Sequence, residues 1–339
     1  HKHRRRQRQM CIRDRNFMSV EVDDMGLDGI VGLDKLKGQK GVNIKIIGAG
    51  GAGGNSVSEA HRQYYQKNEV KDSNNKIDFM ICNTDIQALR NSGDLKIEQR
   101  LRKILLGPEF ARGLGAGGMP EKGKRAAEES KQVLQDYIRG SDIVIIVAGM
   151  GGGTGTGSVS IICQIAKEMG VLAIVICSTP FKFEGDLRFQ RALDGITSFT
   201  KYADSYIVIS NEDLLLNVEK TGNLRETFAI TDSVLLNVLR LLVAILFNSS
   251  IINIDLADVI NCMQNQGQTF IGIGNSHRKE KYIEADQNKM NNLDVENPNE
   301  LNNCEKATLQ ALSHPLLKEE HLSTASNLII HVLVSNKTK

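Results

Sequence analysis

A glycine-rich segment with three hydroxyl side chains has the residue types that bind phosphate. Residues 149–158 hold six glycines together with Thr154, Thr156 and Ser158. Glycines let successive backbone N–H groups turn inward as an anion-binding nest, and a following helix presents its positive end to the same point. A flexible turn is the alternative, but this density of glycines beside an apolar run disfavours it. The segment therefore predicts a site for a phosphate chain.

The flanking residues supply the elements that must position this segment. Residues 141–148 are mainly a continuous apolar run with β-branched side chains, typical of a strand covered on both faces. Residues 159–169 have helical character. Strand, glycine segment and helix together form the layout of a phosphate cradle.

Two further glycine segments precede this one in the sequence. Gly48, Gly50 and Gly53 follow an apolar run at 42–47 and satisfy G-x-G-x-x-G, so a nicotinamide dinucleotide fold has to be considered. A Walker A loop is disfavoured because no Gly-Lys-Ser/Thr follows. The third segment, 113–120, precedes an amphipathic helix. Three such loops exceed what one pyrophosphate in a dinucleotide fold requires.

Polar residues follow other predicted strands. The runs at 77–82, 172–177 and 206–210 alternate with helical segments, which predicts an α/β fold with a doubly wound, mostly parallel sheet. Asn83-Thr84-Asp85 would then lie at the carboxyl edge, where such sheets bind ligands. Asp85 either contacts the ribose of a nicotinamide cofactor or caps the following turn.

Two pairs of charged residues have a spacing that suits a helix face. Glu184 and Arg188 are four residues apart, for which a surface ion pair is the favoured interpretation. Asp255 and Asp258 are three apart after the long apolar helix predicted for 224–247, which we expect to be buried between two domains. The two aspartates either serve the N-terminus of a helix or orient a water for attack on a phosphoryl group.

Length, cysteine content, apolar runs and charge limit the kinds of protein that this chain can be. The 339 residues suit two domains, and the six cysteines are scattered without a C-x-x-C pair, as in a reducing compartment. We find no run of about 20 apolar residues, so we expect a soluble protein. The net charge of +2 hides an uneven distribution, because residues 1–15 hold seven Lys/Arg against one acid and the remainder carries −4. We expect residues 1–15 to lie outside the fold, either as an artefact or, less favoured, as a nucleic-acid arm.

These segments, in their order and spacing, resemble the tubulin/FtsZ GTPase family from about residue 42 to 334. The glycine signature at 151–157 carries the resemblance, and Asn253-x-Asp255-x-Ala257-Asp258 is similar to the synergy loop of the bacterial FtsZ branch. The resemblance implies GTP or GDP as ligand, Mg²⁺ on the phosphates, and GTP hydrolysis activated by self-assembly. It also implies a cytoplasmic cell-division protein whose filaments form a ring at mid-cell.

Site residues follow from the resemblance. Asn253, Asp255 and Asp258 would complete the GTPase site of the next subunit in a head-to-tail filament. Glu184 would hold the ribose and Asn211 would read the guanine edge. No side chain is assigned as a metal ligand. The nucleotide contacts as a whole would be Gly51, Ala52, Gly53, Gly54, Asn55, Gly117, Gly152, Gly153, Thr154, Gly155, Thr156, Glu184, Arg188, Asn211 and Ser233.

Three positions depart from the family pattern. Met119 stands where the family usually has Asn, and Ser233 stands where an acid usually meets the base, with Asp232 just before it. Asn248-Ser249-Ser250 replaces a more usual Arg-Pro-Gly. These departures bear on the guanine contact and on the approach to the synergy loop.

The resemblance also sets expected boundaries. We expect a disordered extension at 1–40, a GTP-binding domain at 41–222, a central helix at 223–248, and an incomplete α+β C-terminal domain at 249–339 with an insertion at 275–304. Ala307–Leu317 reads as a helix and Leu328–Val334 as a strand.

Partners follow from the resemblance as well. Expected partners are copies of the chain itself and, in the full-length protein, other division proteins and membrane anchors, with neither nucleic acid nor direct membrane insertion. Because the family continues beyond these segments, we expect this chain as written to bind GTP but to assemble or hydrolyse it poorly. A non-hydrolysing FtsZ-like scaffold and a nicotinamide-dependent oxidoreductase remain the alternatives.

Overall fold

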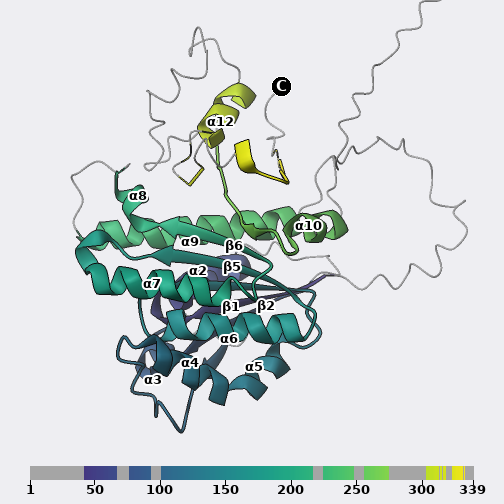
Figure 1. Cartoon of the computed structure of the whole chain (residues 1–339). Helices are drawn as coiled ribbons and strands as arrows, with labels where there is room; N and C mark the ends of the chain where they lie inside the picture. Colours follow the sequence, from purple (N-terminus) through teal and green to yellow (C-terminus); the bar gives the residue numbers. More distant parts are fainter. Residues whose placement is uncertain are drawn as a thin grey trace, which may run out of the picture.

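The computed structural model in Figure 1 describes most of residues 42–332. The predictions for 1–40, for Asn248 to Asp255 and for most of the 275–304 insertion lie outside the described residues. The described residues are 42–66, 76–92, 101–216, 224–247, 256–274, 303–312, 314, 316–317, 323–330 and 332.

A seven-stranded parallel sheet forms the centre of the molecule. The strands lie in the order β3-β2-β1-β4-β5-β6-β7, so the chain winds outward in one direction from β1 and in the other from β4. This confirms the predicted doubly wound α/β fold and places its switch point between β1 and β4. The strands are β1 Asn43–Ala49, β2 Lys76–Asn83, β3 Leu101–Leu105, β4 Ile143–Gly149, β5 Leu172–Thr179, β6 Ser205–Ser210 and β7 Gly267–Gln268.

Helices cover both faces of this sheet. Because side chains alternate along each strand, Ile44 and Ile46 of β1 belong to one core cluster while Ile47 and Ala49 belong to the other. The first core cluster includes residues of α2, α3, α8, α9 and α10, and the second includes residues of α4 to α7 (Figure 1). The helices are α2 Gly50–Gln66, α3 Ile86–Asn91, α4 Pro120–Glu129, α5 Lys131–Ile138, α6 Thr154–Glu168, η3 Lys182–Glu184, α7 Asp186–Phe199, α8 Asn211–Leu216, α9 Leu224–Phe247, α10 Leu256–Met263 and α12 Asn303–Leu312.

The long helix α9 has the predicted bounds. It buries Leu235, Val238, Leu239 and Leu242 and packs against α2 and β5, so its main partner is the sheet and its covering helix. None of the helices in the described part of the chain is both long and apolar enough to cross a membrane.

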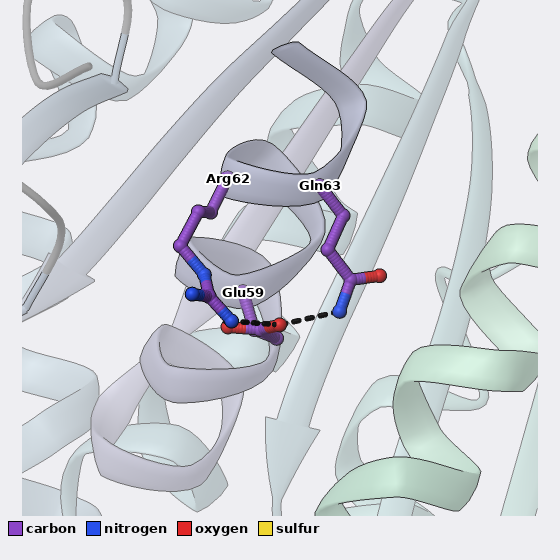
Figure 2. A network of polar contacts seen from close by, with 3 residues as sticks. All are labelled: Glu59, Arg62 and Gln63. Atoms are coloured by element: carbon purple, nitrogen blue, oxygen red, sulfur yellow. Dashed lines mark hydrogen bonds and ion pairs between the residues drawn. The ribbon is translucent and has the colours of Figure 1, made fainter. Parts of the chain in front are cut away.

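The outer surface of α2 is held by a local network of polar side chains (Figure 2). The Glu59 carboxylate accepts hydrogen bonds from Arg62 Nη2 (2.6 Å), Arg62 Nε (2.9 Å) and Gln63 Nε2. The hydrogen bonds from Arg62 are the main cause that lowers the pKa of Glu59. These pairs stabilise the second half of α2.

Several boundaries differ from the prediction. Helix α6 begins at Thr154, where Val159 was expected, and helix α2 begins within the first glycine segment at Gly50. Glycine's low helix propensity suggested loops, but close packing of these first turns overrides that preference. The C-terminal helix spans 303–312, where 307–317 was expected, and the described residues of 328–334 form no strand.

Candidate functional site

The glycine segments meet at the carboxyl ends of β1 and β4. Helix α2 starts directly after β1, and α6 starts five residues after β4. A Cβ placed on Gly50 would lie 2.8 Å from Gly155 N, so the two helix N-termini are adjacent. Both helices therefore direct unpaired backbone N–H groups and a positive dipole end toward one place, which suits an anion.

One group of glycines at this site is required by packing. A Cβ on Gly53 would overlap Val147 O, and a Cβ on Gly155 would lie 2.8 Å from Gly149 O. A Cβ on Gly149 would lie 2.8 Å from Ala52 Cβ. Since real Cβ atoms do not approach so closely, these three glycines let α2 and α6 sit directly on the strands.

A second group, which we call the rim glycines, has no such requirement. A Cβ on Gly51, Gly54 or Gly152 would meet nothing within 4 Å, and none of the three has a positive φ. A cavity of about 230 Å³, lined by Gly51, Gly54 and Asn55, opens between α2, the end of β2 and α3. The fold therefore does not explain the rim glycines, whereas a ligand lying against the backbone would.

Three threonine hydroxyls connect the loops of the site. Thr84 Oγ1 and Thr154 Oγ1 share a hydrogen bond of 2.6 Å, and Thr84 O accepts from Gly115 N (3.0 Å). Thr156 Oγ1 accepts from Gly151 N (2.8 Å). The sequence placed Thr84 at the carboxyl edge of the sheet, where ligands bind, but Thr84 was not among the nucleotide contacts that the resemblance implied.

The glycine segment 113–120 lies beside the glycine segment 149–158. Its glycines adopt left-handed conformations, with φ of +74° at Gly113, +83° at Gly115, +59° at Gly117 and +71° at Gly118. A Cβ on Gly153 would lie 3.0 Å from Met119 N, so the two segments touch. They therefore bring three glycine loops to one edge, as the sequence predicted.

Met119 occupies the N-cap position of α4 in this segment. Its side chain is 49% exposed and makes no capping hydrogen bond. The Asn usual in the family is a strong N-cap residue, so the departure removes a cap. The N-terminal amides of α4 therefore lack a side-chain partner from their own cap residue.

Glu184 and Arg188 form an ion pair of 2.9 Å, as the spacing predicted. Glu184 belongs to η3 and Arg188 to α7, so the pair crosses between two elements. The second carboxylate oxygen of Glu184 accepts from Phe181 N (3.0 Å), while Arg188 is half exposed. A Cβ on Gly151 would lie 2.7 Å from Arg188 O, which brings the pair to the edge of the glycine loop.

Asn211 and Ser233 lie toward the other side of the site. Asn211 is the first residue of α8, directly after the carboxyl end of β6, and it is 6% exposed. Its Oδ1 has no hydrogen-bond partner among the described residues. Ser233 lies on α9, which packs against α8, and burial raises the pKa of its neighbour Asp232. A buried amide oxygen without a partner is unusual and points to a ligand donor.

Asp85 serves as the N-cap of α3. Its Oδ1 accepts from Gln87 N (2.8 Å) and Ala88 N (3.3 Å). This is the second of the two roles that the sequence left open for Asp85.

Asp258 lies at the opposite end of the sheet. It is half buried in the first turn of α10, and its neighbour Val259 packs into the core beside α9. Soon after α10, Gly267 pairs with Ser205, the first residue of β6, whereas Asn211 follows the last residue of that strand. Figure 1 shows α8 and α10 near opposite ends of α9. The structure therefore does not bring Asp258 to the glycine loops of its own chain, and Asn253 and Asp255 lie outside the described residues.

Known proteins resemble this chain in sequence and in structure. Proteins named Cell division protein FtsZ from Mycoplasmopsis pulmonis and Pseudomonas aeruginosa are 38% and 36% identical to it over 86% and 85% of its length. The chain spans 64% of the length of each of these relatives. A solved structure described as "FtsZ dimer, empty (M. jannaschii)" superposes with a TM-score of 0.67 at 32% identity, covering 84% of this chain and 72% of that one.

A family model agrees with these similarities. The model of the tubulin/FtsZ family, GTPase domain, matches residues 43–219, which run from β1 to just beyond α8. The match contains all three glycine segments, the Glu184–Arg188 pair and Asn211. It gives no support to a nicotinamide-dependent oxidoreductase. This chain belongs to the tubulin/FtsZ family.

Proposed function

We propose that this chain binds GTP at the carboxyl edge of its sheet and hydrolyses it to GDP and phosphate when a second copy completes the site. The observation that carries the first half is the set of rim glycines, at which a Cβ would meet nothing within 4 Å and the fold has no need of glycine. The observation that carries the second half is Asp258, which lies at the opposite end of the sheet from these glycines.

Different residues would contact the phosphates, the ribose and the guanine of the nucleotide. Phosphate oxygens would accept from the first turns of α2 and α6 and from Thr154. Glu184 and Arg188 would lie at the ribose, and Asn211 and Ser233 at the guanine. The unpaired Oδ1 of Asn211 fits this role, because guanine offers N–H donors. The proposed phosphate-contacting backbone is Gly51, Ala52, Gly53, Gly54, Asn55, Gly117, Gly152, Gly153 and Gly155.

We propose Mg²⁺ as a companion of the nucleotide. Among the residues that the structure describes, no group of three or more His, Cys, Asp or Glu side chains is placed to hold a metal ion. The phosphate oxygens would therefore supply most of its ligands. When bound, it would neutralise charge on the phosphates.

Head-to-tail stacking of copies would bring the two ends of the sheet together. The amino edge of one copy, with α10 and Asp258, would face the glycine loops of the next. Asp258, together with Asn253 and Asp255 just before it in sequence, would then orient water at the terminal phosphate. Such a contact is heterologous and does not close, so it produces filaments. The likeness to an FtsZ dimer supports self-association.

The biological role that fits is filament formation at the division site in the cytoplasm. Two relatives are named as cell division proteins, and this chain spans 64% of each. We propose other division proteins and membrane anchors as further partners. We propose no contact with nucleic acid and no membrane insertion.

GTP hydrolysis per chain, measured as protein concentration is raised, tests this proposal. We expect the turnover of this chain, which the sequence predicts to be low, to appear only above a threshold of protein concentration. Asp258→Ala should keep GTP binding and lose turnover, whereas Asp194→Ala, which changes an exposed aspartate of α7, should keep both. A rate per chain that is independent of concentration would contradict the shared site. GTP binding without turnover, in the wild type and in Asp258→Ala alike, would instead indicate a non-hydrolysing scaffold.

A further inference from the structure

Thr156 has a buried side chain whose two ends contact different elements. It lies in the first turn of α6 and is 2% exposed. Its hydroxyl accepts the backbone N–H of Gly151 (2.8 Å). Its methyl group faces α7 so closely that a Cβ on Gly195 would overlap it. Thr156 therefore links the glycine loop between β4 and α6 with helix α7.

The residue that Thr156 holds has an unusual backbone conformation. Gly151 has a φ of +93°, and a Cβ there would lie 2.7 Å from Arg188 O and 3.3 Å from Pro180 Cγ. Glycine adopts many other conformations at similar cost. A loop rich in glycine thus needs a specific contact to select one shape, and the hydrogen bond from Gly151 N to Thr156 is such a contact.

The two threonines of the α6 N-terminus differ in what they offer a ligand. Thr154, the first residue of the helix, is only partly buried and shares its hydroxyl hydrogen bond with Thr84. A hydroxyl that exchanges one hydrogen bond with another hydroxyl retains a further donor or acceptor position. Thr156 has almost no exposed surface and its oxygen already accepts the Gly151 amide.

We propose that Thr156 is a positioning residue that shapes residues 149–153 for the nucleotide and does not contact it. This inference rests on the proposed GTP site, and it replaces the nucleotide contact that the sequence predicts for Thr156. Without the hydroxyl, the loop would occupy its binding shape for only part of the time. The apparent dissociation constant then rises in inverse proportion to that fraction.

Two substitutions separate the hydroxyl from the methyl group. Thr156→Val keeps the shape and removes the hydroxyl, while Thr156→Ser keeps the hydroxyl and removes the methyl group. Thr197→Val is the matched control, because Thr197 is a helical threonine of α7 whose hydroxyl bonds only to Leu193 O (3.0 Å). If Thr156→Val does not fold, Thr156→Ala takes its place, since it makes no added demand on space.

Two readouts are measured on the full chain. The first is hydrogen exchange of the Gly151 amide without nucleotide, and the second is the dissociation constant for GTP with Mg²⁺. We expect Thr156→Val to speed the exchange and to weaken GTP binding, each about tenfold, which corresponds to about 1.4 kcal/mol. Thr156→Ser and Thr197→Val should resemble the wild type in both.

Distinct results would overturn this inference and the proposed function. Wild-type exchange and affinity in Thr156→Val would overturn the positioning role while the GTP site stands. An equal loss in Thr156→Ser would also overturn it, because packing of the methyl group would then be the cause. A wild-type chain that does not bind GTP would overturn the proposed function, whereas the exchange of Gly151 would still show whether Thr156 shapes the loop.

Discussion

The two ends of the parallel sheet differ in whether the polar groups near the strand ends have hydrogen-bond partners within the chain. At the amino edge, the Lys45 ammonium donates to Tyr137 O and Arg139 O (3.0 Å) at the end of α5, and Asn43 N donates to Asp142 Oδ2 (2.8 Å). At the carboxyl edge, the oxygen of Asn211 is buried without a partner among the described residues. There too, α4 and α6 begin without a side-chain cap.

This difference in hydrogen-bond partners indicates that a ligand binds at the carboxyl edge. A buried polar group without a partner costs about 1–3 kcal/mol. At the amino edge, Lys45 and Asp142 satisfy neighbouring backbone groups and contribute stability, although the buried Tyr137 hydroxyl there also lacks a hydrogen-bond partner among the described residues. The carboxyl edge retains this cost at Asn211, which is reasonable only if a bound nucleotide supplies the missing partners. Substitutions at the two edges should therefore separate binding from stability.

The largest effect is expected at the rim of the carboxyl edge. Gly152→Ala adds a methyl group where the protein leaves open space, so the free energy of unfolding should change by no more than about 0.5 kcal/mol. The methyl group would occupy the position of the phosphates, and GTP affinity should fall about a hundredfold, or about 2.7 kcal/mol. Titration calorimetry and urea denaturation measure the two quantities.

Gly140→Ala is the control at the amino edge. Gly140 has a φ of +75°, so this change should cost about 1 kcal/mol of stability and leave GTP affinity unaltered. If Gly152→Ala weakened stability and spared binding, the rim glycines would be structural after all.

A smaller effect on binding is expected at Asn211. Asn211→Leu removes an acceptor that has no partner in the described structure, so stability should stay the same or increase. GTP affinity should fall roughly tenfold, because the guanine loses its hydrogen bond. Thermal denaturation with and without GTP measures both, and a destabilised Asn211→Leu with normal affinity would refute the contrast between the edges.

Lys45 tests the amino edge. Lys45→Met should lower the free energy of unfolding by about 1 kcal/mol, since two carbonyls lose a partly exposed charged donor, and should leave GTP affinity unchanged. Burial holds the pKa of Lys45 below its ordinary 10.5, although Asp78 opposes the shift. Between the two pKa values the unfolded chain binds more protons, so stability should rise with pH there. Alkaline urea titrations should show this rise in the wild type and not in Lys45→Met.

A helix or strand of this chain could be predicted from the sequence where its own residues carry a clear hydrophobic pattern. The continuous apolar runs of β4 and β5 and the length of α9 were predicted, because burial on both faces leaves an unmistakable pattern. Strand β3 was missed, since it is an edge strand of the sheet and Arg102 and Lys103 interrupt its apolar residues.

In the candidate site, too, only features that lie within one stretch of the sequence could be predicted. The glycine segments were predicted because their density is visible in one stretch of chain. The hydrogen bonds of Thr84 with Thr154 and of Gly151 with Thr156 were not, because they depend on how loops from different strands meet. The resemblance assigned Asp258 to the next subunit, whereas the residues alone did not place it, because its location depends on the path of the folded chain.

The smallest effect is expected in α2, between the two edges. Glu59→Gln weakens the network in Figure 2 and should cost at most about 0.5 kcal/mol, because the pair with Arg62 is exposed to solvent. Since the pKa of Glu59 is lowered in the folded chain, its contribution is present above the ordinary value of 4.5 and is lost as pH falls through the folded pKa. Urea denaturation at pH 7 and at steps below pH 4.5 should show a difference that shrinks as the pH falls, and a constant difference would exclude the charge as its source.

Equilibrium titration of the full chain with GTP, ATP and NADH, each with Mg²⁺, tests the central claim most directly. The unpaired Oδ1 of Asn211 at the carboxyl edge is proposed to bind the guanine of the nucleotide. GTP should therefore bind at one site per chain, and it should protect the chain against thermal unfolding. ATP and NADH should bind at least about tenfold more weakly, because neither offers the guanine donors to Asn211. Equal affinity for ATP, or preferred binding of NADH, would contradict the account.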